Sequence, residues 1–209
     1  MPNLRQLLAA HAPLLLIDAA SARIQVGLLG ASVPARWAGS DEESGVGVFR
    51  CLEQLGVQPG EPGAFVYCDG PGSVLGVRTV AMALRTWTML KPRPVYAYHS
   101  LALVAHALGR PEIHLIADAR RDSWHCLAMG EGLRRVTTAE LAGKQLVMPA
   151  GFRHWTPLPA GVAHTPYAVA ELLPGTLEQE LFRAVEAPDA FLHEEPSYVT
   201  WTPQIHRAP

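Results

Sequence analysis

The glycine-rich stretch CDGPGSVLGVRT contains residue types that can bind a phosphate group. It follows the apolar run AFVYC and precedes a helical pattern, a place where backbone N–H groups often hold anions. The spacing of Gly70, Gly72 and Gly76 matches neither the P-loop pattern GxxxxGK[ST] nor the dinucleotide pattern GxGxxG. The stretch therefore leaves two alternatives: an anion contact at Gly70, Gly72 and Ser73, or a tight strand-to-helix turn capped by Ser73. The sequence favours the turn.

Two aspartates occupy matching places 100 residues apart. Asp18 ends the apolar run LLLI, Asp118 ends IHLIA, and each is followed by a polar turn and an alternating segment that closes on glycine. Such a repeat predicts a duplicated supersecondary unit. Paired carboxylates could hold a metal–nucleotide between two lobes, with Asp18 contacting the ligand. Aspartate is also common in turns because it hydrogen-bonds its own backbone, and the sequence favours that role.

No other motif points to catalysis or metal binding. The nine histidines form no HExxH pattern, and Ser100 lacks the GxSxG context of a hydrolase nucleophile. Three cysteines without CxxC spacing predict reduced thiols and a cytoplasmic protein. A formal net charge of −2 gives no electrostatic reason for strong direct binding of nucleic acid. We therefore expect no catalytic residue, no metal and no cofactor.

The helix predicted after the glycines has two distinct faces. Its apolar stripe faces its own core and consists of Val77, Val80, Ala81, Leu84 and Trp87. A second stripe, at spacings of four, three and four, consists of Arg78, Met82, Arg85 and Met89. Methionine and arginine are enriched in protein interfaces, so this stripe predicts a partner surface. A partly solvated face is the alternative.

The elements that position these residues follow from the apolar periodicity. With 49% hydrophobic and 17% charged residues, the 209-residue chain can bury a sizeable core. Leu4, Leu7 and Leu8 predict a short helix, which three strands and a helix at 41–55 follow. Next come a strand at 64–68, a helix at 74–90, a strand at 95–99 and a helix capped by Ser100.

The second half contains weaker patterns. We expect strands around LRRV and QLVMP, a short helix at TTAELAG, and helices at 167–173 and 176–185. The best division lies near Gly109–Pro111. It predicts a first lobe of residues 1–110 with an N-terminal extension, and an abbreviated second lobe of residues 111–209 with a C-terminal tail. The whole chain is expected to have an α/β fold.

Several motifs together resemble the bacterial TsaB (YeaZ-type) family. DGPGSVLGVRTVAMALRTW is similar to the family's GPGSFTGLRIG, and LLLIDAASARIQVGLL is similar to its opening ILAIDTST…VAL. PVYAYHSLALVAHAL resembles PVxGVSSLExLA, and IHLIADARRDSWHCLAM resembles VLAxIDARRGEVYxAxY. EEPSYVTW resembles the terminal PxYLR. The motifs occur in the family's order, from Leu14 to about Gly130 and again near the end.

The resemblance implies an actin-like (ASKHA, RNase H-like) fold of two duplicated lobes with mixed sheets. It also implies a non-catalytic scaffold subunit that partners a TsaD-like paralogue and a TsaE-like ATPase in tRNA threonylcarbamoyladenosine modification. Such a subunit would contact tRNA only indirectly and would not bind membranes. The first-lobe helices would contact the paralogue or a second copy.

The sequence departs from the family pattern at several places, among them the start of the first long helix, where DEESGVGV stands in place of the family's His-Ser/Thr motif. Val74-Leu75-Gly76 replaces the family FTG, and Ala19-Ala20 replaces Ser-Thr after the first aspartate. The alternative to the scaffold is a nucleotide- and metal-dependent enzyme of the same superfold that uses the cleft between the lobes.

Overall fold

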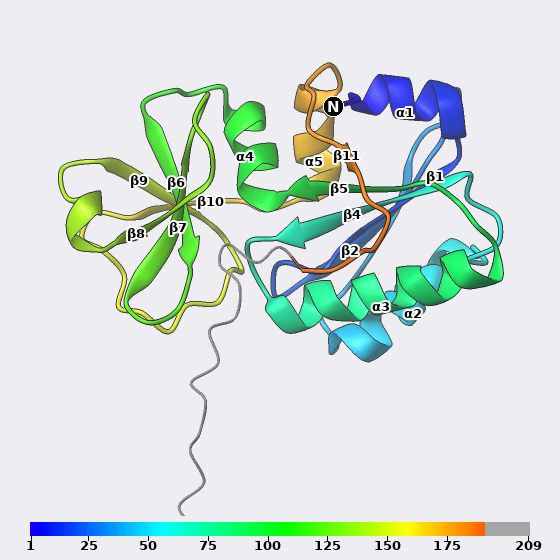
Figure 1. The fold of residues 1–209 in the computed structure, drawn as a ribbon, viewed down its shortest axis with the longest axis horizontal. Helices are drawn as coiled ribbons and strands as arrows, with labels where there is room; N and C mark the ends of the chain where they lie inside the picture. Colours follow the sequence, from blue (N-terminus) through cyan, green and yellow to red (C-terminus); the bar gives the residue numbers. More distant parts are fainter. Residues whose placement is uncertain (191–209) are drawn as a thin grey trace, which may run out of the picture.

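The computed structural model describes residues 1–190, which form two mixed β-sheets with helices (Figure 1). The first sheet has the order β11-β5-β4-β1-β2-β3 and the second has the order β10-β9-β6-β7-β8. The strands of the first sheet are β1 (Leu14–Asp18), β2 (Ile24–Leu29), β3 (Arg36–Ser40), β4 (Ala64–Gly70), β5 (Val95–His99) and β11 (Arg183–Ala184). Those of the second sheet are β6 (Ile113–Asp118), β7 (Ser123–Ala128), β8 (Arg134–Thr137), β9 (Gln145–Pro149) and β10 (Ala163–Thr165). The helices are α1 (Leu4–His11), α2 (Ser44–Leu55), α3 (Val74–Leu90), α4 (Ser100–Leu108), α5 (Val169–Leu172), η1 (Ala139–Leu141) and η2 (Leu173–Thr176).

The two sheets repeat one topology, as the spacing of the aspartates predicts. In the first sheet β1 pairs antiparallel with β2 and parallel with β4, and β2 pairs antiparallel with β3. In the second sheet β6, β7, β8 and β9 are paired in the same way. Asp18 lies opposite Gln25, and Asp118 lies opposite Trp124, at equivalent ends of the two hairpins. The predicted duplication and the α/β class are confirmed.

The first sheet is covered on both faces (Figure 1). Helices α2 and α3 lie side by side on one face, and α1, α4 and α5 lie on the other. The predicted core stripe of α3 is buried, with Trp87 partly exposed at its end. Gly47 lets α2 approach the sheet closely, because a Cβ there would lie 2.4 Å from Cδ1 of Ile24. The first lobe therefore positions both of its long helices by tight packing on one sheet face.

The second sheet has much less helical cover. Within the described residues, the β8–β9 connection contains only the single turn η1, and residues 150–162 join β9 to the parallel β10 without a helix. Helix α4 packs against β6 and β7. Trp124 of β7 is nevertheless fully buried, and its indole Nε1 donates to the hydroxyl of Thr138 at 3.0 Å. In the second lobe, loops thus cover much of the sheet surface that helices cover in the first lobe.

Some local predictions are wrong. Ser100 is not the cap of α4: it is the first helical residue, and its hydroxyl donates to the carbonyl oxygen of Pro71 at 2.6 Å. The helix expected at 176–185 does not form. The fully buried Phe182 packs edge-on against Tyr98 instead, and this contact draws the chain onto the first sheet.

The end of the described chain returns to the first lobe. Strand β11 pairs with β5, so the segment expected to belong wholly to a second lobe of residues 111–209 contributes to the first sheet. The motif EEPSYVTW lies outside the described residues. At the other end, α1 forms as predicted, with Leu4 and Leu7 buried and Leu8 partly buried. Across residues 1–190 we find no helix with the length and apolar character needed to cross a membrane.

Candidate functional site

The glycine-rich stretch forms a sharp turn from β4 into α3. Gly70 and Gly72 have φ values of +118° and +150°, which side chains disfavour. A Cβ on Gly72 would lie 2.3 Å from the carbonyl oxygen of Ala20. One on Gly76 would lie 2.2 Å from the carbonyl oxygen of Ala19. The glycines therefore let α3 pack directly on the backbone that follows Asp18.

Ser73 caps α3, as predicted. Its hydroxyl accepts a hydrogen bond from the backbone N–H of Gly76 at 3.3 Å, and its own N–H donates to the carbonyl oxygen of Ala20 at 2.7 Å. The strand-to-helix turn is confirmed. An anion contact at Gly70, Gly72 and Ser73 stays a prediction, and Ser73 does line the cavity described below.

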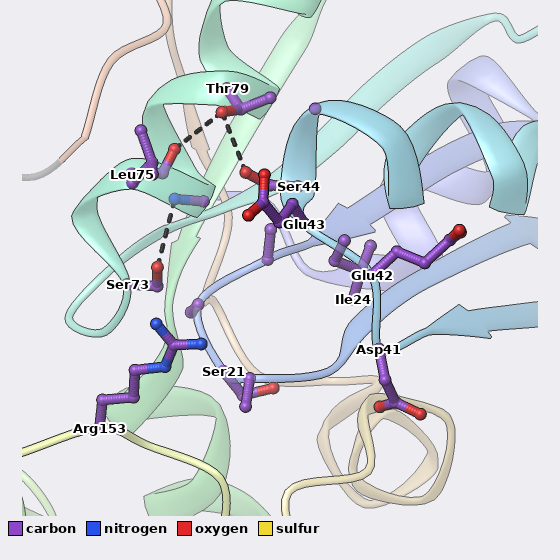
Figure 2. Close-up of a pocket in the computed structure, with 15 residues that line it drawn as sticks. Ser21, Ile24, Asp41, Glu42, Glu43, Ser44, Ser73, Leu75, Thr79 and Arg153 are labelled. Atoms are coloured by element: carbon purple, nitrogen blue, oxygen red, sulfur yellow. Dashed lines mark hydrogen bonds between the residues drawn. The ribbon is translucent and has the colours of Figure 1, made fainter.

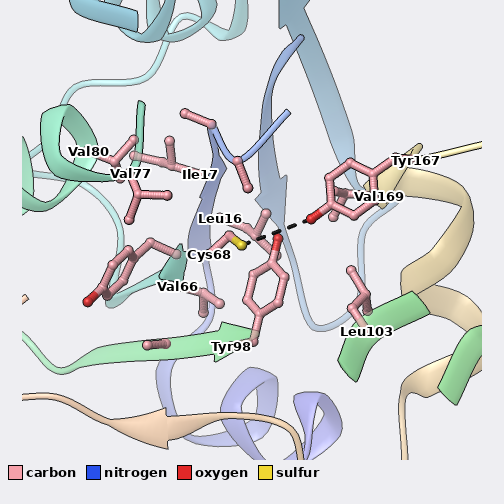
Figure 3. Close-up of a cluster of buried hydrophobic side chains, with 14 of the residues drawn as sticks. Leu16, Ile17, Val66, Cys68, Val77, Val80, Tyr98, Leu103, Tyr167 and Val169 are labelled. Atoms are coloured by element: carbon pink, nitrogen blue, oxygen red, sulfur yellow. Dashed lines mark hydrogen bonds between the residues drawn. The ribbon is translucent and has the colours of Figure 1, made fainter. Parts of the chain in front are cut away.

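Asp18 is fully buried beneath this turn. Its Oδ1 accepts from the N–H of Ala20 at 2.9 Å, and its Oδ2 accepts from the hydroxyls of Tyr98 and Tyr167, each at 2.6 Å. Figure 3 shows these two phenols meeting beside Cys68 from β5 and from the segment before α5. Burial raises the pKa of Asp18, although all these hydrogen bonds oppose the rise. Asp18 thus ties the returning chain to the first sheet and presents no oxygen to a cleft.

Asp118 has a different environment at the equivalent position. Its Oδ2 accepts from the backbone N–H groups of Trp155 and Thr156, the latter at 2.9 Å, and its Oδ1 accepts from that of Arg120 at 2.5 Å. Partial burial would raise the pKa of Asp118, but these three hydrogen bonds outweigh it and lower the pKa. The guanidinium of Arg120 stacks 3.1 Å from the centroid of the Trp155 ring. Asp118 therefore organises a turn and a loop of the second lobe.

Two cavities flank the start of α3. One, of about 320 Å³, lies between the lobes and is lined from one side by the stretch 69–75 and from the other by Asp118, Arg120 and Trp155. The other, of about 450 Å³, lies between the start of α2, the turn after Asp18 and the start of α3 (Figure 2). Arg153 lines both cavities. Among residues 1–190, no cluster of His, Cys, Asp and Glu side chains is arranged to hold a metal ion.

An ionic cluster at the interlobe cavity was not predicted. The side chain of Asp69, at the end of β4, is fully buried; its Oδ1 lies 2.7 Å from Nδ1 of His99, and its Oδ2 contacts the guanidinium of Arg183. Asp69 also lines the cavity between the lobes. Nothing in the local sequence signals this cluster, because its members lie 30 and 114 residues apart.

The Met–Arg stripe of α3 lies on the outside of the first lobe. Met82 and Met89 are 57% and 85% exposed. Arg78 is exposed and Arg85 is half-buried, and both face Asp189 near the end of the described chain. The stripe is therefore exposed, which fits both a partner surface and a partly solvated face, and its arginines already have a contact within the chain.

The fold and this site define a two-lobed α/β protein built by duplication of one mixed sheet. Over residues 45–176 the chain matches the family model described as TsaD, tRNA N6-adenosine threonylcarbamoyltransferase, and it belongs to that family. No curated protein sequence matches it.

Among the solved structures that match this chain, two illustrate the shared fold. YeaZ from Pseudomonas aeruginosa has 20% sequence identity and a TM-score of 0.56, over 77% of this chain and 89% of that chain. An uncharacterised protein similar to the peptidase YeaZ from Pseudomonas aeruginosa has 21% identity and a TM-score of 0.59, over 88% and 98% of the two chains. The resemblance to TsaB (YeaZ-type) proteins and the actin-like fold class are confirmed.

Proposed function

We propose that this chain is a non-catalytic scaffold subunit in the modification of tRNA to threonylcarbamoyladenosine. Its partner would be a TsaD-like paralogue, joined by a TsaE-like ATPase, and it would contact tRNA only indirectly. Membership of the family named for this transfer supports the pathway. The match spans α2 and α3, the helices that would form the contact.

The exposed outer face of these two helices carries the proposal. Phe49 of α2 is 47% exposed, and Leu75 of α3 is 75% exposed, in addition to the two methionines of the stripe. Leu75, Met82 and Met89 recur every seven residues and so share one side of α3, and exposed apolar side chains grouped in this way often mark an interaction site. Burying them against a partner is favourable by about 25 cal/mol per Å² of apolar surface. A helical face of a partner subunit would cover these apolar side chains. That partner would be either the paralogue or a second copy of this chain.

Introducing negative charge on this face tests the proposal. We expect the double substitution Met82→Asp and Met89→Asp to lower affinity for the TsaD-like subunit about tenfold or more, since both carboxylates would be desolvated at the contact. Val33→Asp is the matched control, because Val33 is 67% exposed on the β2–β3 turn. Titration calorimetry and size-exclusion chromatography measure the complex. A wild-type chain that forms no complex with the TsaD-like subunit contradicts the proposal.

The cavity between the lobes favours a second candidate, a nucleotide- and metal-dependent enzyme. Asp118 and Arg120 both line it, and the lowered pKa of Asp118 keeps that carboxylate charged. The burial of Asp18 counts against this candidate, because only one of the two matching aspartates reaches the cavity. Calorimetry with ATP and Mg²⁺ separates the two functions. A nucleotide-dependent enzyme must bind the nucleotide and so produce a heat of binding, whereas the scaffold function needs no such binding.

A further inference from the structure

The last described residues cross the first lobe and end on α3. After β11, the segment Val185–Ala190, here named the C-terminal strap, leaves the edge of β5 and runs to the helix (Figure 1). The hydroxyl of Tyr67 donates to the carbonyl oxygen of Asp189 at 2.9 Å, and the N–H of Asp189 donates back to that hydroxyl at 3.1 Å. Burial raises the pKa of Tyr67 to about 12, so the phenol keeps the proton that it donates. The backbone of the strap is therefore firmly attached.

The side chain of Asp189 is held much more loosely. Its carboxylate lies 3.5 Å from the guanidinium of Arg85 and 4.0 Å from Nε of Arg78, and all three side chains are 40–54% exposed. Arg85 also donates from Nε to the carbonyl oxygen of Pro188 at 2.6 Å. Exposed ion pairs of this kind contribute about 0–1 kcal/mol. The carboxylate can leave the arginines while the backbone of the strap stays in place.

These arginines belong to the surface that the proposed function uses. Met82 lies between them in sequence on the same exposed stripe of α3, and Met89 follows Arg85. A partner that covered the methionines would also cover the two guanidinium groups. Burying guanidinium donors without acceptors is costly, and the single carboxylate of Asp189, at 3.5 Å and 4.0 Å, leaves most donors of the two groups unsatisfied, so such a partner should supply a further acceptor. Within the described residues, the acceptor that the arginines already face is a carboxylate.

We infer that the TsaD-like partner brings a carboxylate, flanked by apolar side chains, that replaces Asp189 on Arg78 and Arg85. This inference rests on the proposed function and specifies the chemistry of its interface. Asp189 occupies the arginine pair in the free chain and must give it up when the complex forms. Arginine favours the exchange, because its planar group binds carboxylates with several parallel donors once water is excluded.

The substitution Asp189→Asn tests the exchange. Asparagine keeps the backbone contacts with Tyr67 and an oxygen for the N–H of Ala190, which now donates to Asp189 Oδ1 at 2.8 Å. With the competing charge gone, we expect the TsaD-like subunit to bind about two- to fivefold more tightly at low salt. The gain should vanish at about 0.5 M salt, where charge effects are screened. Asp122→Asn, on an exposed turn of the second lobe, makes the same charge change and should have no effect.

A second substitution isolates the arginine. Adding Arg78→Gln to the Asp189→Asn variant should cancel the gain, because the group that receives the partner's carboxylate is then removed. If the wild type binds and Asp189→Asn binds equally or more weakly, the inference is wrong and the proposed function stands. If neither the wild type nor the Asp189→Asn variant binds the TsaD-like subunit, the proposed function is contradicted as well. Tighter self-association in place of tighter heteromeric binding also overturns the inference, since a second copy would then be the partner.

Discussion

The turns that follow Asp18 and Asp118 share one topology and differ in nearly every contact. Both aspartates end the central strand of a mixed sheet, and each accepts a hydrogen bond from the backbone N–H two residues later. Asp18 is sealed beneath α3 with two tyrosines. Asp118 faces a cavity and holds a loop by its backbone. Duplication has preserved the strand pairing while the packing on each copy has diverged.

The difference follows from what covers each sheet. In the first lobe, α3 packs on the turn after Asp18, so the carboxylate needs buried partners. In the second lobe, a loop takes that place and supplies backbone N–H groups, so the carboxylate stays ionised at the rim. Aspartate thus has a buried structural role in the first lobe, whereas in the second lobe it is a charged carboxylate that lines the cavity between the lobes. Equivalence of sequence position does not give equivalence of chemistry.

Removing the two carboxylates should expose this asymmetry most clearly. Asp18→Ala leaves the hydroxyls of Tyr98 and Tyr167 buried without their acceptor, and we expect a loss of about 3–5 kcal/mol in the free energy of unfolding. Asp118→Ala frees backbone groups that water can reach, and we expect a loss of about 1 kcal/mol. Urea denaturation followed by circular dichroism measures both values. Equal losses would mean that the two carboxylates contribute equally to stability, contrary to the difference in their burial and hydrogen bonds.

The close packing of α3 on the first turn predicts the next effect. Gly76→Ala places a methyl group against the carbonyl oxygen of Ala19, a backbone atom that cannot move without shifting the turn, so we expect a loss of about 2–4 kcal/mol. Gly45→Ala in α2 meets nothing within 4 Å and should be neutral or stabilising by up to about 1 kcal/mol. Thermal unfolding of the pair measures the contrast. A neutral Gly76→Ala would show that the approach of α3 is looser than described.

The sequence predicts most of the framework and little of the packing that distinguishes the lobes. Apolar runs such as LLLID and IHLIAD identify the strands, because buried strands carry a strong local pattern. The repeat identifies the duplication, and Ser73 with its glycines identifies the turn into α3. Each strand run, each copy of the repeat and the turn is a local pattern that can be recognised without knowing what packs against it.

The long-range contacts escape such local patterns. Tyr167 reaches Asp18 across 149 residues, and Asp189 faces arginines on α3 more than 100 residues earlier. The stripe at Arg78 and Arg85 predicts a surface, but only the fold shows that the strap lies on it. The helix expected at 176–185 fails for the same reason: the burial of Phe182 outweighs the local helical pattern.

The pH dependence of stability offers the finest contrast between the two aspartates. In the folded protein the pKa of Asp18 is raised above its unfolded value of 3.8. The contribution of Asp18 to the free energy of unfolding is therefore fully present below pH 3.8 and is lost as the pH rises through the folded pKa. In the folded protein the pKa of Asp118 is lowered below its unfolded value of 3.8. The contribution of Asp118 to the free energy of unfolding is therefore present above pH 3.8 and is lost as the pH falls through the folded pKa. The stability difference between wild type and Asp18→Asn should therefore shrink as the pH rises above about 4, whereas that for Asp118→Asn should shrink as the pH falls below about 4. Urea titrations across this range measure both slopes, and slopes of the same sign would show that the two carboxylates share one environment after all.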